Sequence, residues 1–201
     1  MGILKYMMIW KPDWNSSKDL LRRLGWTMVD AAMMNPNLVE VLFGQFVQMN
    51  ILMGNCRGDL NPDLKRKIYA MAVNHNLAIM VITKIKVGGG RAKRIITNLL
   101  FNGFITTETI GYVGGLWVLW KKDEADIDLL AATEQEIHAT IKVCHSNLTW
   151  FISAIYASPC LAKRRLVWSN LLEIAKLHNH PWLMLGDFNE VLSSEEKYGG
   201  N

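Results

Sequence analysis

The sequence contains little cysteine, little proline and no long uninterrupted apolar run. Among its 201 residues there are three Cys and five Pro. The cysteines are odd in number and their separations match neither zinc-site nor redox spacing, so we expect free thiols in a reducing compartment. A membrane-spanning helix needs about 20 consecutive apolar residues, and the best candidate, residues 38–53, is interrupted by polar side chains. We therefore predict no membrane span and no membrane partner.

The chain also lacks a secretory signal and a large excess of charge of one sign. No small-residue cleavage site follows the short apolar start, so we predict a protein that is not secreted and stays in the nucleus or cytoplasm. The 22 Lys+Arg against 18 Asp+Glu give a formal net charge of +4, which permits nucleic acid as a partner without requiring it. The three glycines at 88–90 lack the Lys and Ser/Thr of a P-loop. We expect no small-molecule cofactor.

The hydrophobic content of 50% indicates a folded chain, and its pattern divides the chain in two. Residues 1–48 are rich in Met and Trp and show no alternating strand pattern, so we predict a mainly helical N-terminal appendage of unknown role, with a short helix beginning at Ser17. Residues 49–201 alternate between strand-length apolar runs and amphipathic stretches, which is an α/β pattern. Strands are expected at 50–54, 77–82, 104–107, 116–120, 127–132, 137–143, 149–156 and 182–185. Helices are expected at 61–75, from the flexible glycine turn at 88–90 through residue 100, and at 161–177.

The segment Gly186-Asp187-Phe188-Asn189-Glu190 carries the most informative chemistry, because it follows a buried strand. Active sites of open α/β sheets gather at strand ends. Asp187 and Asn189 project to the same side by alternation, so that one ionisable group and one amide face a common point. This pair suits protonation of a leaving oxygen beside a bound phosphate. The alternative is an Asx-type turn that ends the strand.

Two further strand ends carry polar groups. Asn55 can bind a hard cation or a phosphate, and Arg57 can bind a phosphate; the alternative is a plain turn between a strand and a helix. Tyr156 ends a later strand, where a lone Tyr is usually a residue at the rim of the core.

Taken in order, these segments resemble the endonuclease/exonuclease/phosphatase superfamily, and most closely the apurinic-type endonuclease domain of plant LINE-type (non-LTR) retrotransposon polyproteins, which also carry reverse transcriptase. The resemblance covers residues 49–201 and leaves 1–48 outside. Its motifs are Asn55-Cys56-Arg57-Gly58, Gly114-Gly115, Glu134-Gln135-Glu136-Ile137-His138, Ile155-Tyr156-Ala157-Ser158-Pro159 and residues 186–197.

The resemblance implies a DNase I-like fold, here a partial four-layer α/β/β/α sandwich with mixed, mostly antiparallel sheets. It implies Mg²⁺-dependent hydrolysis of a phosphodiester, in which DNA is nicked. It assigns Asn55 to the metal and Tyr156 to the scissile phosphate. It assigns Asp187 to the proton of the water or leaving group, and Asn189 is the amide that orients it.

The sequence departs from the family at two places. Ile82 stands where the family has the metal-binding Glu of a Glu-Thr-Lys triplet, and Thr83 is expected to point to the other face. The chain is expected to be truncated before the family's C-terminal Asp and Ser-Asp-His. We therefore expect a degenerate, inactive hydrolase, and the alternatives are a live metal-dependent phosphodiesterase or phosphatase and a non-enzymatic DNA-binding or structural remnant. The helix residues that could touch a DNA backbone are Arg91, Lys93, Arg94 and residues 163–165, although such charges are usually just solvated.

Overall fold

A computed structural model describes residues 5–9, 38–42, 48–58, 62–107, 115–178 and 180–189. Within these ranges the secondary structure alternates between strands and helices, as the sequence pattern predicts. The strands are β1 Lys5–Ile9, β2 Leu38–Leu42, β3 Gln48–Gly58, β4 Ile79–Ile85, β5 Gly103–Thr106, β6 Gly115–Trp120, β7 Ala125–Ala132, β8 Glu136–Val143, β9 Thr149–Tyr156 and β10 Trp182–Asp187, and the helices are α2 Pro62–Asn74, α3 Gly89–Ile96 and α4 Leu161–Leu177.

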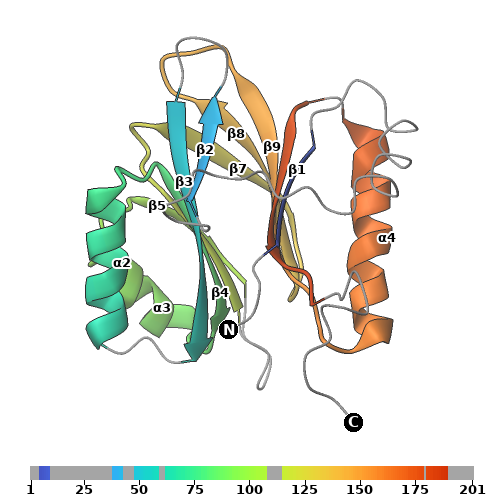
Figure 1. The fold of residues 1–201 in the computed structure, drawn as a ribbon, viewed down its shortest axis with the longest axis horizontal. Coiled ribbons are helices and arrows are strands. Elements are labelled where there is room, and N and C mark those ends of the chain that lie inside the picture. Colours follow the sequence, from blue (N-terminus) through green and yellow to red (C-terminus); the bar gives the residue numbers. More distant parts are fainter. Residues whose placement is uncertain are drawn as a thin grey trace.

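The strands form two five-stranded sheets that pack face to face. One sheet has the order β2-β3-β4-β6-β5 and the other has the order β1-β10-β9-β8-β7. Only β3 with β4 and β9 with β10 pair in parallel among the described strands, and every other pair is antiparallel. Helices α2 and α3 cover the outer face of the first sheet, and α4 covers that of the second (Figure 1). The expected four-layer α/β/β/α sandwich with mostly antiparallel sheets is confirmed.

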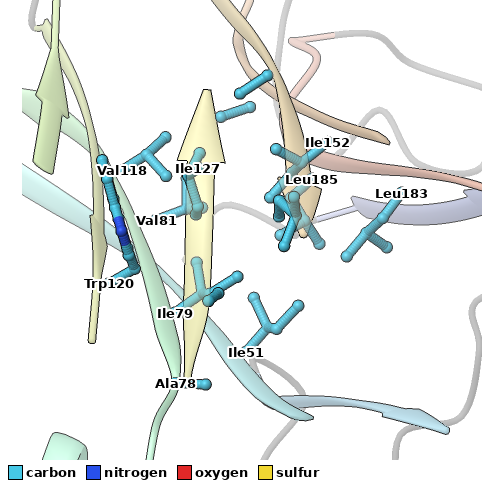
Figure 2. Packing of buried hydrophobic residues seen from close by; sticks show 14 of the residues in the cluster. Ile51, Ala78, Ile79, Val81, Val118, Trp120, Ile127, Ile152, Leu183 and Leu185 are labelled. Atoms are coloured by element: carbon cyan, nitrogen blue, oxygen red, sulfur yellow. The ribbon is translucent and has the colours of Figure 1, made fainter. Parts of the chain in front are cut away.

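The main core lies between the two sheets. Figure 2 shows Ile51, Ile79 and Val81 of the first sheet pointing toward side chains of the second, among them Ile152 and Leu185. The alternate residues of the same strands form two outer clusters, one beneath α2 and α3 and one beneath α4. Strands covered on both faces are apolar at nearly every position, which is why β6 reads Gly-Leu-Trp-Val-Leu-Trp without alternation.

The two described segments of the front region are strands, which differs from the mainly helical appendage expected for residues 1–48. β1 pairs antiparallel with β10, from Lys5 opposite Gly186 to Ile9 opposite Trp182. β2 pairs antiparallel with β3. The expected helix at Ser17 lies outside the described residues, and a domain boundary after residue 48 stays a prediction.

Several element boundaries also differ from the expected ones, and β3, for example, runs over Gln48–Gly58 where 50–54 was expected. β4 begins two residues later than expected and continues to Ile85, because β4 has an irregular end that apolar periodicity does not predict. α3 ends at Ile96, four residues early, and Thr97 is its C-cap. None of the helices in the described ranges is long and apolar enough to cross a membrane.

Candidate functional site

The carboxyl ends of four strands meet at one edge of the sandwich, and each presents a polar residue on the face toward the opposite sheet. Asn55 follows Ile51 and Met53 on the inner face of β3, and its register partner on the parallel strand β4 is Thr83. Tyr156 and Asp187 are register partners at the ends of β9 and β10. Because parallel strands end at the same edge, pairing brings these side chains together in two adjacent pairs, one from each sheet.

The Asp187 carboxylate joins the two sheets. Its Oδ2 lies 3.1 Å from Nζ of Lys84 and accepts a hydrogen bond of 3.4 Å from Nδ2 of Asn55. Both partners belong to the first sheet, whereas Asp187 ends the second. The side chain of Asp187 is 14% exposed and that of Lys84 is 32% exposed, so the carboxylate is largely buried while the ammonium can be reached from solvent.

A β-bulge explains how Lys84 reaches the space between the sheets. Ile82 lies opposite Trp117 and Ile85 lies opposite Gly115, so that β4 has one more residue than β6 in this interval. Ile82 and Ile85 both pack in the outer cluster beneath the helices. The extra residue lets both Thr83 and Lys84 face the inner side. Lys84 has φ +60°, a left-handed conformation that costs a residue with a Cβ about 1–2 kcal/mol, and bulges of this kind are frequent beside functional sites.

The expectation that Ile82 faces the site and Thr83 points away is wrong for this chain. Ile82 is buried in the outer cluster with the helices, whereas Thr83 follows Ile79 and Val81 on the inner face. The run from Ile79 to Ile82 is apolar at every position, so its sequence carries no sign of which residues face which side. The hydroxyl group of Thr83 therefore lies on the inner face of β4, where the side chain of Ile82 was expected.

Asn189 closes the turn after β10. Its backbone N–H donates to Oδ1 of Asp187 at 3.1 Å, and its Nδ2 donates to the carbonyl oxygen of Ala157 at 2.5 Å. The Asx-type turn that was the alternative reading of this segment is thus present. It does not remove the carboxylate from the site, because Oδ2 of Asp187 still faces Lys84 and Asn55. The amide of Asn189 fixes the end of β10 against the residue after β9.

Tyr156 lies beside the same ammonium group. Nζ of Lys84 is 5.4 Å from the centroid of the phenol ring, within the range of a cation–π contact. Partial burial raises the pKa of Tyr156 above its usual value, the ammonium of Lys84 lowers it in part, and the carboxylate of Asp187 raises it further. The phenol therefore stays protonated at neutral pH and can donate a hydrogen bond to an anion.

Gln135 holds the segment that carries Tyr156, a role that the sequence did not reveal. Its carbonyl oxygen accepts from the backbone N–H of Tyr156 at 2.7 Å, and its Oε1 accepts from the backbone N–H of Ser158 at 2.6 Å. Its Nε2 donates to the carbonyl oxygen of Lys163 in α4. These bonds tie the end of β9 to the start of α4. The resemblance had included Gln135 in a motif without giving it a function.

Two buried polar atoms at the site have no hydrogen-bond partner within the described part of the chain. They are Oδ1 of Asn55 and Oγ1 of Thr83. Thr83 is 0% exposed. In native structures, few buried polar atoms lack a hydrogen-bond partner. Where one does, a bound group that supplies the partner is one explanation. Both atoms belong to the inner-face pair that lies next to Lys84 and Asp187.

The donor set does not fit the Mg²⁺ ion that the family resemblance implies. Mg²⁺ is usually held by one or two carboxylates together with waters and substrate phosphates. In the described residues the site holds one carboxylate, that of Asp187, and its Oδ2 is paired with the ammonium of Lys84. No group of three or more His, Cys, Asp or Glu in the described ranges could hold a metal ion. A divalent cation at Asp187 would stand against the positive charge of Lys84.

Two of the predicted nucleic-acid residues, Arg91 and Arg94, lie away from this cluster. Arg91 and Arg94 are exposed on α3, which packs on the outer face of the first sheet. No described hydrogen bond or ion pair links either side chain to Asp187. The side chain of Arg57 lies outside the described part of the structure. Their contact with DNA stays a prediction.

His138 is also separate from the site. It is 2% exposed on the outer face of its sheet, beneath α4, with Nδ1 2.7 Å from Oγ of Ser153 and Nε2 3.2 Å from Oε2 of Glu136. Trp182 donates to the same Ser153 hydroxyl, and Asn170 of α4 donates to Glu136. This network binds the helix to the sheet. Ser153, His138 and Glu136 contact one another in the order found in a hydrolytic triad. All three are buried, so a substrate cannot reach them.

Comparison with known proteins shows the fold. No protein-family model matches the sequence, and no curated protein matches it. Among solved structures, an endonuclease/exonuclease/phosphatase family protein from Bacteroides thetaiotaomicron is 15% identical with a TM-score of 0.52, over 70% of this chain and 63% of that one. TDP2 of D. rerio, in complex with a single-strand DNA product, is 12% identical with a TM-score of 0.53, over 71% of this chain and 61% of that one.

A third structure, the endonuclease domain of TRAS1, a telomere-specific non-LTR retrotransposon, is 14% identical with a TM-score of 0.48, over 69% of this chain and 58% of that one. The chain spans less than two thirds of the length of each of these three structures. At 12% and 15% identity, the likeness to the D. rerio and Bacteroides thetaiotaomicron structures concerns the fold alone, which is that of endonuclease/exonuclease/phosphatase proteins.

Proposed function

We propose that this chain is a retrotransposon-derived, endonuclease-like domain that binds a phosphodiester of DNA at the strand ends and has lost metal-dependent hydrolysis. The observation that carries the proposal is the meeting of Asn55, Tyr156, Asp187 and Asn189 at one edge of the sandwich, joined across the sheets through Asp187. These are the four residues that the sequence motifs single out. The retrotransposon origin rests on the order of those motifs in the sequence.

The chemistry of the cluster suits an anionic phosphodiester. Such a ligand offers oxygens that accept hydrogen bonds, and the site offers donors in the phenol of Tyr156, the ammonium of Lys84 and the amide of Asn55. The pKa of Tyr156 lies above its usual value, and its hydroxyl is a donor at neutral pH, as that of an ordinary Tyr is. The edge position leaves Lys84 and Asp187 partly open to solvent. A phosphate group can therefore reach the donors.

The same cluster lacks the arrangement for metal-dependent hydrolysis. Thr83 supplies a hydroxyl on the inner face of β4, and Ile82 supplies an alkyl group on the outer face. The remaining carboxylate, Asp187, is neutralised by Lys84. General acid–base catalysis contributes about 10²–10⁴-fold to a rate, and groups that act as a unit fail together. We therefore expect no measurable nicking of DNA.

The test is a supercoiled-plasmid nicking assay with Mg²⁺, run beside DNA binding followed by fluorescence anisotropy with a labelled duplex. The parent should bind the duplex without nicking the plasmid, and Asp187→Ala should bind with altered affinity and also fail to nick. A commercial nuclease in the same buffer shows that the substrate can be cut, and circular dichroism shows that both proteins are folded. Nicking by the parent that Asp187→Ala abolishes would overturn the proposal in favour of a live metal-dependent phosphodiesterase.

A second pair of variants tests which face of β4 belongs to the site. Thr83→Glu places a carboxylate beside Asn55, whereas Ile82→Glu places one in the outer apolar cluster. If either variant restores nicking, it should be Thr83→Glu, and Ile82→Glu should mainly lower stability, because it buries a charge. Recovery by Ile82→Glu alone would contradict the inner-face assignment of Thr83.

The alternative is a non-enzymatic nucleic-acid-binding remnant that uses the exposed basic residues of α3. Arg91, Lys93 and Arg94 are exposed on this helix. Binding through them would depend steeply on salt and would be insensitive to Asp187. A double variant, Arg91→Ala with Arg94→Ala, therefore separates the two modes. It should leave most of the affinity intact if the strand-end site is the binding site.

A further inference from the structure

The Lys84 ammonium occupies the centre of the strand-end site. We propose that this ammonium serves there in place of a divalent cation, so that the chain binds a phosphodiester without metal. This inference rests on the proposed function, because it names the group that holds the phosphate at that same site. It differs from the family's implied chemistry, in which Mg²⁺ holds the phosphate.

The first line of support is position. Nζ of Lys84 lies 3.1 Å from Oδ2 of Asp187 and 5.4 Å from the ring centroid of Tyr156. It thereby faces the two residues that the motifs assign to the proton and to the scissile phosphate. Among the described contacts, only one of its three N–H donors has a partner oxygen, that of Asp187. The other two N–H donors are available to a phosphate. A phosphate can reach them from solvent, because the Lys84 side chain is 32% exposed.

The second line of support is the backbone that aims the side chain. The bulge in β4 turns two consecutive residues, Thr83 and Lys84, toward the inner side, and Lys84 adopts φ +60°. A left-handed conformation at a residue with a Cβ is unfavourable. The ion pair with Asp187 then fixes the direction of the side chain. Strained backbone of this kind clusters at sites where geometry is used to bind or react.

The third line of support is the pair of unsatisfied atoms beside the ammonium. Oδ1 of Asn55 and Oγ1 of Thr83 are buried, and neither has a hydrogen-bond partner in the described ranges. Nδ2 of Asn55 is directed at Asp187, as expected for an amide that faces a carboxylate. The Thr83 hydroxyl can donate a hydrogen bond to a phosphate oxygen. The Asn55 oxygen is an acceptor, and it suits a water held by the bound phosphate.

The charges at the site favour a monoanionic phosphodiester. Lys84 and Asp187 together carry no net charge, so the ligand is held by the two N–H donors of the ammonium that Asp187 does not use, and a second negative charge on the ligand would have no counter-charge at the site. A divalent cation at Asp187 would be repelled by the ammonium at close range. Mg²⁺ should therefore give no gain in affinity, and at millimolar concentration it should weaken binding modestly, because it screens the DNA.

The experiment measures binding of a short fluorescein-labelled DNA duplex by anisotropy, in EDTA and in Mg²⁺. The parent should bind at least as well in EDTA as in Mg²⁺. Lys84→Ala and Lys84→Gln should weaken binding by about tenfold or more, as expected on losing a hydrogen bond to a charged group. The slope of log Kd against log salt should also fall by about one. Lys84→Arg should retain binding, since it keeps the positive charge.

Lys122→Ala is the matched control. It removes the same charge from an exposed position just after β6, which runs antiparallel to β4, so that it lies at the opposite edge of the sheet. Its effect should stay within about twofold, as for most surface substitutions. Circular dichroism and urea unfolding of each variant verify the fold. Equal losses in Lys122→Ala and Lys84→Ala would overturn the inference, because the effect would then be one of net charge alone.

The two proposals fail in different ways. Binding that needs Mg²⁺ and vanishes in EDTA would overturn the role of Lys84 while leaving phosphodiester binding at the site intact. The absence of binding in both buffers, with the parent folded, would overturn the proposed function and this inference together. Binding in EDTA that Lys84→Ala and Lys84→Gln both weaken by about tenfold or more, with Lys84→Arg retaining it, would support the role of the ammonium.

Discussion

Replacing Thr83 with Val should stabilise the protein, although Thr83 belongs to the candidate site. Thr83 is 0% exposed, and its Oγ1 has no hydrogen-bond partner in the described part of the structure. A buried hydroxyl left without a hydrogen bond costs about 1–3 kcal/mol. Val has the same shape without the hydroxyl, so the substitution removes that cost and creates no cavity. We expect the free energy of unfolding to rise by about 1–3 kcal/mol.

Thr107→Val is the matched control, because Thr107 is also buried but its hydroxyl is used. Its Oγ1 accepts a hydrogen bond of 2.9 Å from the backbone N–H of Leu116. Removing that acceptor leaves a buried N–H unpaired, which should lower the free energy of unfolding by about 1–3 kcal/mol. The same substitution at two buried threonines is thus expected to change the free energy of unfolding in opposite directions.

Urea unfolding followed by far-UV circular dichroism measures both changes. A shift of 1 kcal/mol corresponds to about 2–4 °C in Tm for a chain of this size, so thermal melts give a second reading. The slope with denaturant should be unchanged, which would show that the surface exposed on unfolding is the same. A loss of stability in Thr83→Val similar to that in Thr107→Val would refute the reasoning, because it would mean that the Thr83 hydroxyl already has a partner in the free protein.

Three further predictions concern separate parts of the fold. Gly186→Ala should lower the free energy of unfolding by about 3 kcal/mol or more in urea unfolding, because the Cβ of the new alanine would lie 2.1 Å from a backbone carbonyl oxygen of β9. A variant as stable as the parent would contradict this, because it would mean that β9 and β10 separate easily. Cys160 should be alkylated by iodoacetamide well before the buried Cys56, as mass spectrometry would show, since backbone N–H groups in the first turn of α4 lower the pKa of its exposed thiol; equal rates would contradict this. Lys84→Ala should raise the pKa of Tyr156 still further, because the ammonium that favours the phenolate is gone. Phenolate absorbance measures this pKa, with Tyr156→Phe as the control that identifies the signal of Tyr156. An unchanged pKa would mean that Lys84 does not lie beside the phenol.

The sequence predicted the layers and most of the strands, because local patterns decide them. The apolar runs and the turn residues from residue 49 onward gave the correct element types in the correct order. The motifs likewise located Asn55, Tyr156, Asp187 and Asn189 at strand ends, which the structure brings to one edge. What these residues do there stays a prediction.

The errors arise where distant segments or local irregularities decide the outcome. β1 forms by pairing of residues 5–9 with β10, across almost the whole chain, and nothing in the short Met-rich run indicates that partner. The bulge in β4 is equally hidden, because Ile79 to Ile82 is apolar on both faces and the sequence offers no alternation to read. One inserted residue then changes which side Thr83 and Lys84 face. The motif alone suggested the wrong face and overlooked the lysine.

The central claim is that the ends of strands from both sheets form one phosphodiester-binding site. NMR titration of the ¹⁵N-labelled protein with dithymidine monophosphate, in EDTA, tests it most directly, because Asn55 and Asn189 carry side-chain amide signals that can be followed individually. The account predicts that these amides and the backbone signals of Thr83 and Lys84 shift together with one dissociation constant. Shifts confined to α3, with the strand-end signals unmoved, would contradict it.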